Sequence, residues 1–368
     1  MKEEELLNKD IISGSYQARD VRFLLKNING LISEQNNEFR ENAMQSGVHY
    51  SEMLPIEYQP SKGYMDIFFE TLEQSKGKLA KLTAILAEEI IKKRGQNIVL
   101  VSLARAGTPI GILIKRYIEY KYKINVPHYS ISIIRDIGLD TNAINYILEQ
   151  HAGAELQFID GWTGKGVIQN TLEEACRKFY VDFNIKLNPD LAVLSDPAYC
   201  TETYATREDF LIPSACLNST VAGLISRTVY NENFIGEKDF HGAKYYEEWE
   251  TEDVSKFFID EITKEFDNSV NEVKIEKVVK DNRGLKEVKK LQSFLNINNI
   301  NLIKPGVGET TRVLLRRMPW KILVNSMDNP NLRHIYKLSE EKNVPVEVFK
   351  DMSYSCCGVI KPKERGDI

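Results

Sequence analysis

The chain has 368 residues, of which 42% are hydrophobic and 27% charged. This composition is typical of a globular protein and excludes collagen-like, mucin-like and wholly disordered chains. No apolar run reaches the roughly 18 residues of a membrane span, and the acidic start MKEEELLNKD lacks the apolar segment of a secretory signal. Five cysteines, an odd number in a long chain, favour a reducing compartment. We therefore expect a cytoplasmic protein without membrane contact.

The net charge of −5 is divided unevenly along the chain. Residues 271–368 carry 19 Lys and Arg against 12 Asp and Glu, whereas residues 1–270 carry 29 against 41. A basic C-terminal region joined to an acidic body suggests two tasks, one of them the binding of a polyanion. A solvated surface without a partner is the alternative interpretation.

Short apolar runs alternate with helical patterns through the body of the chain. The first 95 residues or so are predicted to be mostly helical, with a long helix that ends at Gly95. Strands are predicted at 96–102, 128–135, 156–159 and 191–195, and helices at 110–120, 141–151 and 167–180. This order predicts a parallel sheet covered on both faces. Functional loops are then expected at the carboxyl ends of the strands, over 103–107, 160–166 and 196–201.

The C-terminal region predicts a second, smaller domain. Residues 251–281 are strongly charged and helical in pattern, as expected of a connector. From Gly284 onward, helices and strands alternate in the order of a compact α/β/α sandwich. We therefore divide the chain into a body at 1–270, a linker at 271–283 and a C-terminal domain at 284–368.

Two loops have the character of phosphate-binding turns. The segment from Asp160 to Gly166 follows a predicted strand and opens a helix, so its amides and the helix N-terminus can face one anion. The segment 103–109 (LARAGTP) stands in the same position after the preceding strand. The residues that suit phosphate are Arg105, Ala106, Gly107, Thr163, Gly164, Lys165 and Gly166. A plain turn without a ligand is the alternative.

These two loops resemble those of type I phosphoribosyltransferases. VLVSLARAGTPIGILIKR looks like the pyrophosphate loop of that family, and ELQFIDGWTGKGVIQNTL is similar to its ribose 5-phosphate loop, with Gly161 where a second acidic residue is usual. The resemblance implies a phosphoribosyltransferase-like fold and phosphoribosyl pyrophosphate, with Mg²⁺, as the ligand. It implies that Arg105 holds the pyrophosphate, Asp160 the ribose hydroxyls and Asp196 the acceptor. Capping of a turn is the alternative role for Asp196.

A broader set of segments resembles one bacterial family found in tellurite-resistance and stress-response gene neighbourhoods, the StiP family. The segments are GSYQARDV, GVHYSEMLP, HYSISIIRD, FIDGWTGKG, LSDPA and REDFLIPSACLNSTVAGLISRT. The family carries two descriptions, a phosphoribosyltransferase-like protein and a cysteine protease. The main function that we expect is phosphoribosyl transfer to an RNA- or nucleoside-derived acceptor. The alternatives are a cysteine protease and a non-catalytic, nucleotide-sensing RNA-binding protein.

The cysteine protease alternative rests on Cys216, in LIPSACLNST. A protease of this kind needs a thiolate and a histidine within hydrogen-bond reach. His241 is the candidate base, with His49 as a second choice, because such partners meet in space rather than along the chain. A buried cysteine that serves only in packing is the alternative. No spacing of Cys and His predicts a metal site.

The segment 303–350 resembles the RNA-binding domain of the L7Ae-type proteins and Pelota. The shared features are a Gly-rich loop that enters a basic helix, a strand, the DNPN turn and the helix before NVPV. By this resemblance, the loop and the start of the helix would contact structured RNA. The residues carried over are Lys304, Gly306, Gly308, Glu309, Thr310, Arg312, Arg316 and Arg317. Homo-oligomerisation or closure over a substrate is the alternative use of this domain.

Overall fold

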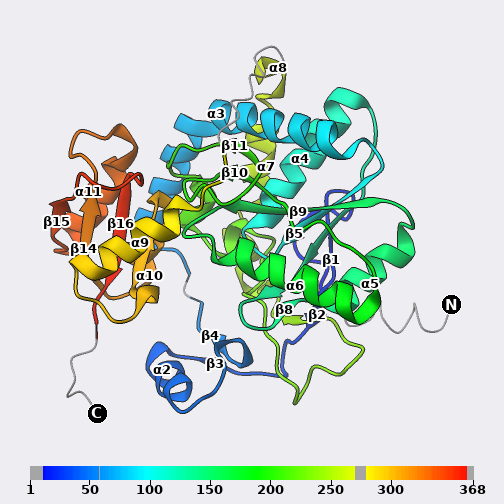
Figure 1. Ribbon diagram of the computed structural model, residues 1–368, viewed down its shortest axis with the longest axis horizontal. Coiled ribbons are helices and arrows are strands. Elements are labelled where there is room, and N and C mark those ends of the chain that lie inside the picture. Colours follow the sequence, from blue (N-terminus) through cyan, green and yellow to red (C-terminus); the bar gives the residue numbers. More distant parts are fainter. Residues whose placement is uncertain (1–10, 58, 270–278, 363–368) are drawn as a thin grey trace.

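A six-stranded parallel sheet lies at the centre of the body (Figure 1). The structure, a computed structural model, describes residues 11–57, 59–269 and 279–362. The sheet order is β1 (Arg22–Phe23), β6 (His128–Ile131), β5 (Ile98–Leu103), β9 (Glu155–Trp162), β10 (Leu191–Ser195) and β11 (Thr203–Thr206). The predicted parallel sheet is confirmed, and β10 covers the residues predicted for it.

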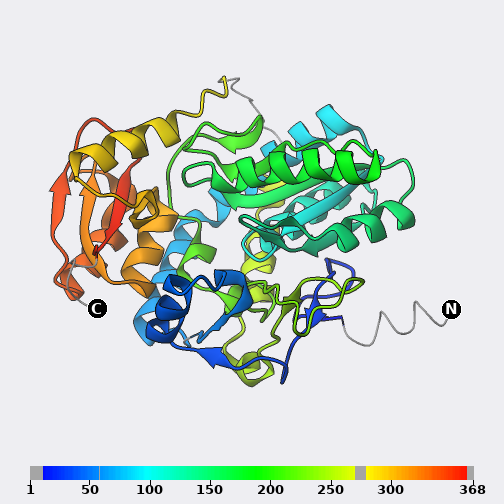
Figure 2. The same cartoon turned by 60° about the horizontal axis from the view of Figure 1, so that its bottom comes forward.

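Helices cover both faces of this sheet, as the alternation of strands and helices predicts (Figure 2). One face carries α3 (Lys62–Arg94) and α4 (Gly107–Tyr122), and the other α5 (Thr141–Gln150) and α6 (Val167–Phe183). Successive residues of a strand point to opposite faces. In β5, Ile98 and Leu100 accordingly pack with α3 and α4, whereas Val99, Val101 and Leu103 pack with α5 and α6.

The prediction of a helical N-terminal extension needs correction. Residues 11–35 are largely irregular and contain three short strands. Strand β1 joins the edge of the main sheet, β2 (Lys26–Asn27) pairs with β12 (Gly242–Ala243), and β3 (Glu34–Gln35) pairs with β4 (Leu54–Pro55). The helical part consists of α2 (Asn37–Gln45) and α3. The long helix α3 ends at Gly95 as predicted, but it covers the sheet instead of extending from it. Pairing with distant strands decides the conformation of such short segments.

The C-terminal domain has the three layers predicted for it. Its sheet runs β13 (Ile303–Pro305), β16 (Cys356–Ile360), β14 (Pro319–Val324), β15 (Val346–Val348). Helix α9 (Arg283–Phe294) packs on one face. Helices α10 (Val307–Arg316) and α11 (Arg333–Glu341) pack on the other face, which is turned toward the body.

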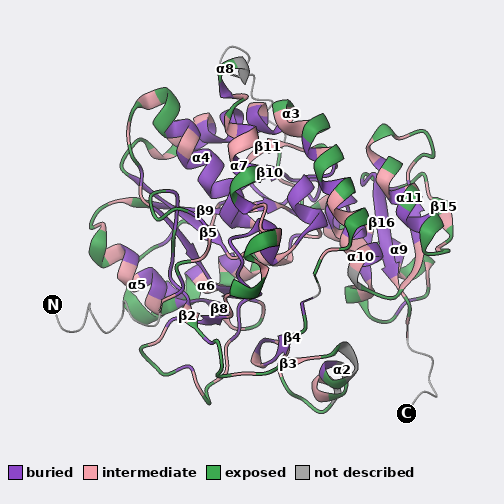
Figure 3. Ribbon diagram, turned by 180° about the vertical axis from the view of Figure 1, so that it is seen from behind, coloured by how far each residue is buried: buried purple, intermediate pink, exposed green. Residues whose placement is uncertain are grey.

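The two domains share one apolar cluster, which continues from the body into the C-terminal domain. Buried residues occur in the elements on both sides of this junction, in α3 and in α10 (Figure 3). Leu314 of α10 and Ile335 of α11 belong to the same cluster as Leu79 of α3 and Ala215 of the 3₁₀ helix η2 (Pro213–Cys216). Residues 271–278 of the predicted linker lie outside the described part of the chain. Among the described helices, none is both long and apolar enough to cross a membrane.

Candidate functional site

A cavity of about 540 Å³ lies between the carboxyl edge of the sheet and the C-terminal domain. Its most prominent lining groups are four arginines from separate parts of the chain: Arg40 on α2, Arg105 after β5, Arg227 from the body, and Arg317 at the end of α10. Glu57 is the one carboxylate among the described residues that line it. We call this space the arginine cavity. Its walls carry an excess of positive charge.

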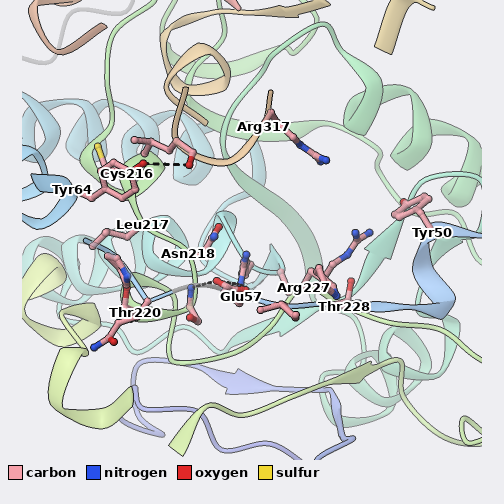
Figure 4. Close-up of a pocket in the computed structure, with 18 of the residues that line it drawn as sticks. Tyr50, Glu57, Tyr64, Cys216, Leu217, Asn218, Thr220, Arg227, Thr228 and Arg317 are labelled. Atoms are coloured by element: carbon pink, nitrogen blue, oxygen red, sulfur yellow. Dashed lines mark hydrogen bonds and ion pairs between the residues drawn. The ribbon is translucent and has the colours of Figure 1, made fainter. Parts of the chain in front are cut away.

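Cys216 lies in the wall of the arginine cavity, at the end of η2 (Figure 4). All five cysteines are buried and free of disulfides. Burial raises the pKa of the Cys176 and Cys357 thiols to about 12, and raises the pKa of Cys200 and Cys356 as well. Those four thiols therefore stay protonated near neutral pH. None of the four lines a described cavity, whereas Cys216 lines the arginine cavity with 3% of its surface exposed.

The two histidines proposed as a base lie elsewhere. The Nδ1 atom of His241 is 2.9 Å from the Ser132 hydroxyl, and its backbone N–H donates to Asp140 at 2.6 Å. Burial lowers the pKa of His241. His49 packs on Tyr50, a residue of the cavity wall, with ring centroids 4.5 Å apart. Among the described residues, no histidine lines the arginine cavity.

The glycine-rich turn after β9 opens onto a different cavity, of about 310 Å³, which we call the glycine-loop cavity. Asp160, Thr163, Gly164, Lys165 and Gly166 line it, together with Ala106. Burial raises the pKa of Asp160 to about 6, although its carboxylate accepts a 2.8 Å hydrogen bond from the Gly161 amide. The Lys165 ammonium donates to the Ile300 carbonyl at 2.7 Å, and burial lowers its pKa to about 8.

The two predicted phosphate loops meet at Ala106, but their charged side chains face different cavities. Arg105 points into the arginine cavity, where its Nη1 lies 2.9 Å and 2.6 Å from the two carboxylate oxygens of Glu57. Lys165 faces the glycine-loop cavity. A Cβ on Gly107 would lie 2.4 Å from the Ile159 carbonyl oxygen, so this glycine lets α4 approach β9 closely. The absence of a side chain at Gly107, a residue predicted to suit phosphate, thus serves packing against the protein's own backbone.

Asp196 is the centre of a buried polar network at the end of β10. Its side chain is fully buried and pairs with the Arg207 guanidinium. It also accepts hydrogen bonds from the Thr163 hydroxyl and from the Cys200 and Thr201 amides. Asp196 lines neither cavity. Its contacts fix the turn after β9 to the turn after β10.

Most residues carried over from the RNA-binding resemblance lie at the junction between the domains. Lys304, Glu309 and Arg312 line the glycine-loop cavity, and the Arg312 guanidinium lies 4.5 Å from the centroid of the Trp162 ring. A Cβ on Gly308 would lie 2.9 Å from that ring, and one on Gly306 would lie 3.3 Å from Asp209. Thr310 is fully buried, Arg317 faces the arginine cavity, and the side chain of Arg316 lies outside the described groups.

Sequence reasoning missed Arg40, Glu57 and Arg227. Arg40 lies on the short helix α2, whereas Glu57 and Arg227 lie in irregular segments. These segments are far apart in the sequence and come together in the folded chain, so no local pattern indicates their shared site. Ser219 and Thr220 follow Cys216 so closely that LNST could have drawn attention to them. The described residues contain no group of three or more metal-ligating side chains.

Comparison with known proteins shows which families the sequence matches. Residues 14–263 match the family described as "Tellurite-like stress resistance cysteine protease StiP", and residues 282–362 match the PELOTA RNA binding domain. The chain is 34% identical over 369 residues to "Cysteine protease StiP" of Acinetobacter baylyi, across 95% of this chain and 94% of the relative.

Among solved structures, a hypothetical protein from Neisseria gonorrhoeae with bound ppGpp is 15% identical and covers 32% of this chain and 66% of its own. The TM-score of this match is 0.24. The family match spans most of the body, and the curated relative spans nearly the whole chain. The chain therefore belongs to the StiP family and carries a C-terminal domain of the Pelota RNA-binding type.

Proposed function

We propose that the chain is a cysteine-dependent hydrolase with Cys216 as its nucleophile. The observation that carries the proposal is the position of Cys216 in the wall of the arginine cavity, whereas the other four thiols are packed away from described cavities. The family description and the name of the curated relative point the same way.

The chemistry would be acyl transfer to sulfur. The Cys216 thiolate attacks a carbonyl carbon, the C–S bond forms as the bond to the leaving amine breaks, and the amine takes up a proton. Water then hydrolyses the thioester and regenerates the thiol. In this proposal the guanidinium groups that line the cavity offset the negative charge of the Cys216 thiolate. No imidazole among the described residues of the cavity wall takes that role.

Labelling with iodoacetamide, mapped by mass spectrometry, tests the nucleophile. We expect Cys216 to react first, because it is the cysteine that lines one of the described cavities. Cys216→Ala should abolish both this labelling and any turnover of peptide probes, whereas Cys176→Ala, which alters a buried thiol on α6, should change neither. Equal and slow labelling of Cys216 and Cys176 would contradict the proposal.

Phosphoribosyl transfer is a second candidate, supported by the glycine-loop cavity. Asp160, Thr163 and Lys165 line this cavity together with Ala106 from the other predicted phosphate loop. Asp160 would hold the ribose hydroxyls, and the turn from Thr163 to Gly166 would hold the 5-phosphate. Mg²⁺ would depend mainly on the diphosphate of the ligand for its oxygen ligands, since Asp160 and Glu309 are the carboxylates that line this cavity.

Isothermal calorimetry with phosphoribosyl pyrophosphate and Mg²⁺ tests this second candidate. Binding that Asp160→Ala weakens by about tenfold or more would support it. The control is Asp281→Ala, which changes a carboxylate paired with Arg283 away from the cavity. Absence of heat at millimolar ligand would remove phosphoribosyl transfer and leave the hydrolase proposal intact.

We also infer that the C-terminal domain contacts RNA beside the glycine-loop cavity. Lys304 and Arg312 supply cationic groups there, next to the Trp162 ring. Filter binding to a structured RNA should weaken with rising salt, because contacts to phosphate release counterions. Lys304→Gln should lower the affinity, and Lys321→Gln, whose ammonium pairs with Glu347, should leave it unchanged. Binding that ignores salt would argue against this contact.

A further inference from the structure

The arginine cavity has a charge imbalance that its own residues do not relieve. Four guanidinium groups line it, against the single carboxylate of Glu57 among the described residues. The Glu57 carboxylate already has partners, because its oxygens accept hydrogen bonds from the Arg105 guanidinium and, at 2.9 Å, from the Ser219 amide. The guanidinium groups of Arg227 and Arg317 therefore face this space without a carboxylate partner among the described side chains. The space is partly shielded from solvent, where repulsion between like charges is stronger than in water.

The repulsion affects the pKa of Arg227. Burial, together with the charges of Arg40, Arg105 and Arg317, lowers its pKa to about 10. Its guanidinium lies 4.7 Å from the centroid of the Tyr50 ring. Among the described side chains, no carboxylate forms an ion pair with Arg227 or Arg317. These two cations face the cavity from the body and from the C-terminal domain.

Two buried hydroxyls in the same wall point to a ligand independently. Ser219 Oγ and Thr220 Oγ1 belong to residues that are only 1% exposed, and neither atom has a hydrogen-bond partner among the described groups. A buried hydroxyl without a partner destabilises a fold, so such groups are normally satisfied. Both residues line the arginine cavity, next in sequence to Cys216 and Asn218.

We propose that the arginine cavity binds a phosphate-bearing ligand, with its phosphate or diphosphate held by Arg227 and Arg317 and by the Ser219 and Thr220 hydroxyls. Guanidinium groups form paired hydrogen bonds with the oxygens of a phosphate, and a dianion neutralises more of the excess charge than a carboxylate does. A cavity of about 540 Å³ is of the size that holds a small molecule larger than the phosphate group itself.

This inference rests on the proposed hydrolase activity in one respect: if the chain is a hydrolase, the anion site implies that its substrate carries a phosphate group. The anion site itself depends on residues other than Cys216. Because Arg317 comes from α10 and Arg227 from the body, a bound phosphate would link the two domains. Release of the ligand would restore the repulsion between the two arginines.

Calorimetric titration of the full chain with inorganic pyrophosphate at low salt tests the site. Arg227→Gln and Arg317→Gln should each weaken binding by about tenfold or more, and Ser219→Ala by less. Arg177→Gln is the control, since Arg177 is an exposed residue of α6 paired with Glu174. Arg317 is exposed and ends its helix, so its variant should fold even if the Arg227 variant does not. A nucleoside diphosphate and a phosphoserine peptide, titrated in parallel, distinguish a free ligand from a phosphorylated protein.

Three results would overturn the proposal. The first is absence of binding at about 10 mM pyrophosphate. The second is unchanged affinity in both arginine variants. The third is a loss of affinity confined to Arg135→Gln, which would show that the anion binds in the glycine-loop cavity instead. Cys216→Ala separates this inference from the hydrolase proposal. If that variant binds pyrophosphate normally while wild-type Cys216 is unreactive, the anion site stands and the nucleophile fails.

Discussion

Burial controls the protonation of Asp160 at the mouth of the turn after β9. It raises the pKa of this carboxyl to about 6, whereas the Gly161 amide and the Arg312 charge act in the opposite direction. The folded chain therefore binds the Asp160 proton more tightly than the unfolded chain does. It follows that the free energy of unfolding decreases as the pH rises from about 4 to about 6, the interval between the two pKa values.

Asp160→Asn should reduce this dependence on pH. Urea unfolding between pH 4 and pH 7 would give a flatter curve for the variant, and Asp209, whose pKa burial also raises to about 6, would account for the slope that remains. Asp281 is the control, because hydrogen bonds from Arg283 lower its pKa. A wild-type slope in Asp160→Asn would show that Asp160 ionises freely in the folded chain.

At the scale of elements, two glycines in helices of the body test how the helices pack. A Cβ on Gly107, at the start of α4, would lie 2.4 Å from a backbone oxygen of β9, whereas one on Gly77, exposed within α3, would meet nothing within 4 Å. Gly107→Ala should lower the free energy of unfolding by about 1–3 kcal/mol. Gly77→Ala should raise it by about 0.5–1 kcal/mol, because alanine favours the helix. Equal effects in thermal unfolding would contradict this account of α4.

The elements also show what the sequence could predict. Apolar runs such as 191–195 define buried strands within a few residues, because a strand covered on both faces needs a continuous run. The turn after β9 was equally visible, since glycines between a strand and a helix are a local signal. The arginine cavity was not, because Arg40, Arg227 and Arg317 are brought together by long-range packing. The direction of Arg105 likewise depends on Glu57, a residue of another segment.

At the scale of the whole molecule, Asp209 joins the body to the C-terminal domain. Its carboxylate accepts from the Val307 amide at the start of α10 and from the Ser355 amide, each at 2.8 Å. Asp209→Ala would leave both buried amides without an acceptor, so we expect a loss of about 2–4 kcal/mol in the free energy of unfolding. Hydrogen exchange should show lost protection at Val307 and Ser355.

Glu287→Ala is the matched control for this prediction. Glu287 also accepts from a backbone amide, that of Ser353 at 2.8 Å, but this contact is exposed to solvent. Its removal should cost less than about 1 kcal/mol. Retained protection of Val307 in Asp209→Ala would mean that apolar packing alone holds the domains together.

The apolar cluster common to α3, η2, α10 and α11 determines what happens when the two domains are separated by truncation. A protein truncated after the body would expose apolar side chains of η2 and α3 to water. A free C-terminal fragment would likewise expose the apolar side chains of α10 that face the body. Calorimetry of the intact chain should then give one heat-absorption peak, because neither half melts alone. Although the two parts of the sequence match two families, we expect them to unfold as a single cooperative unit.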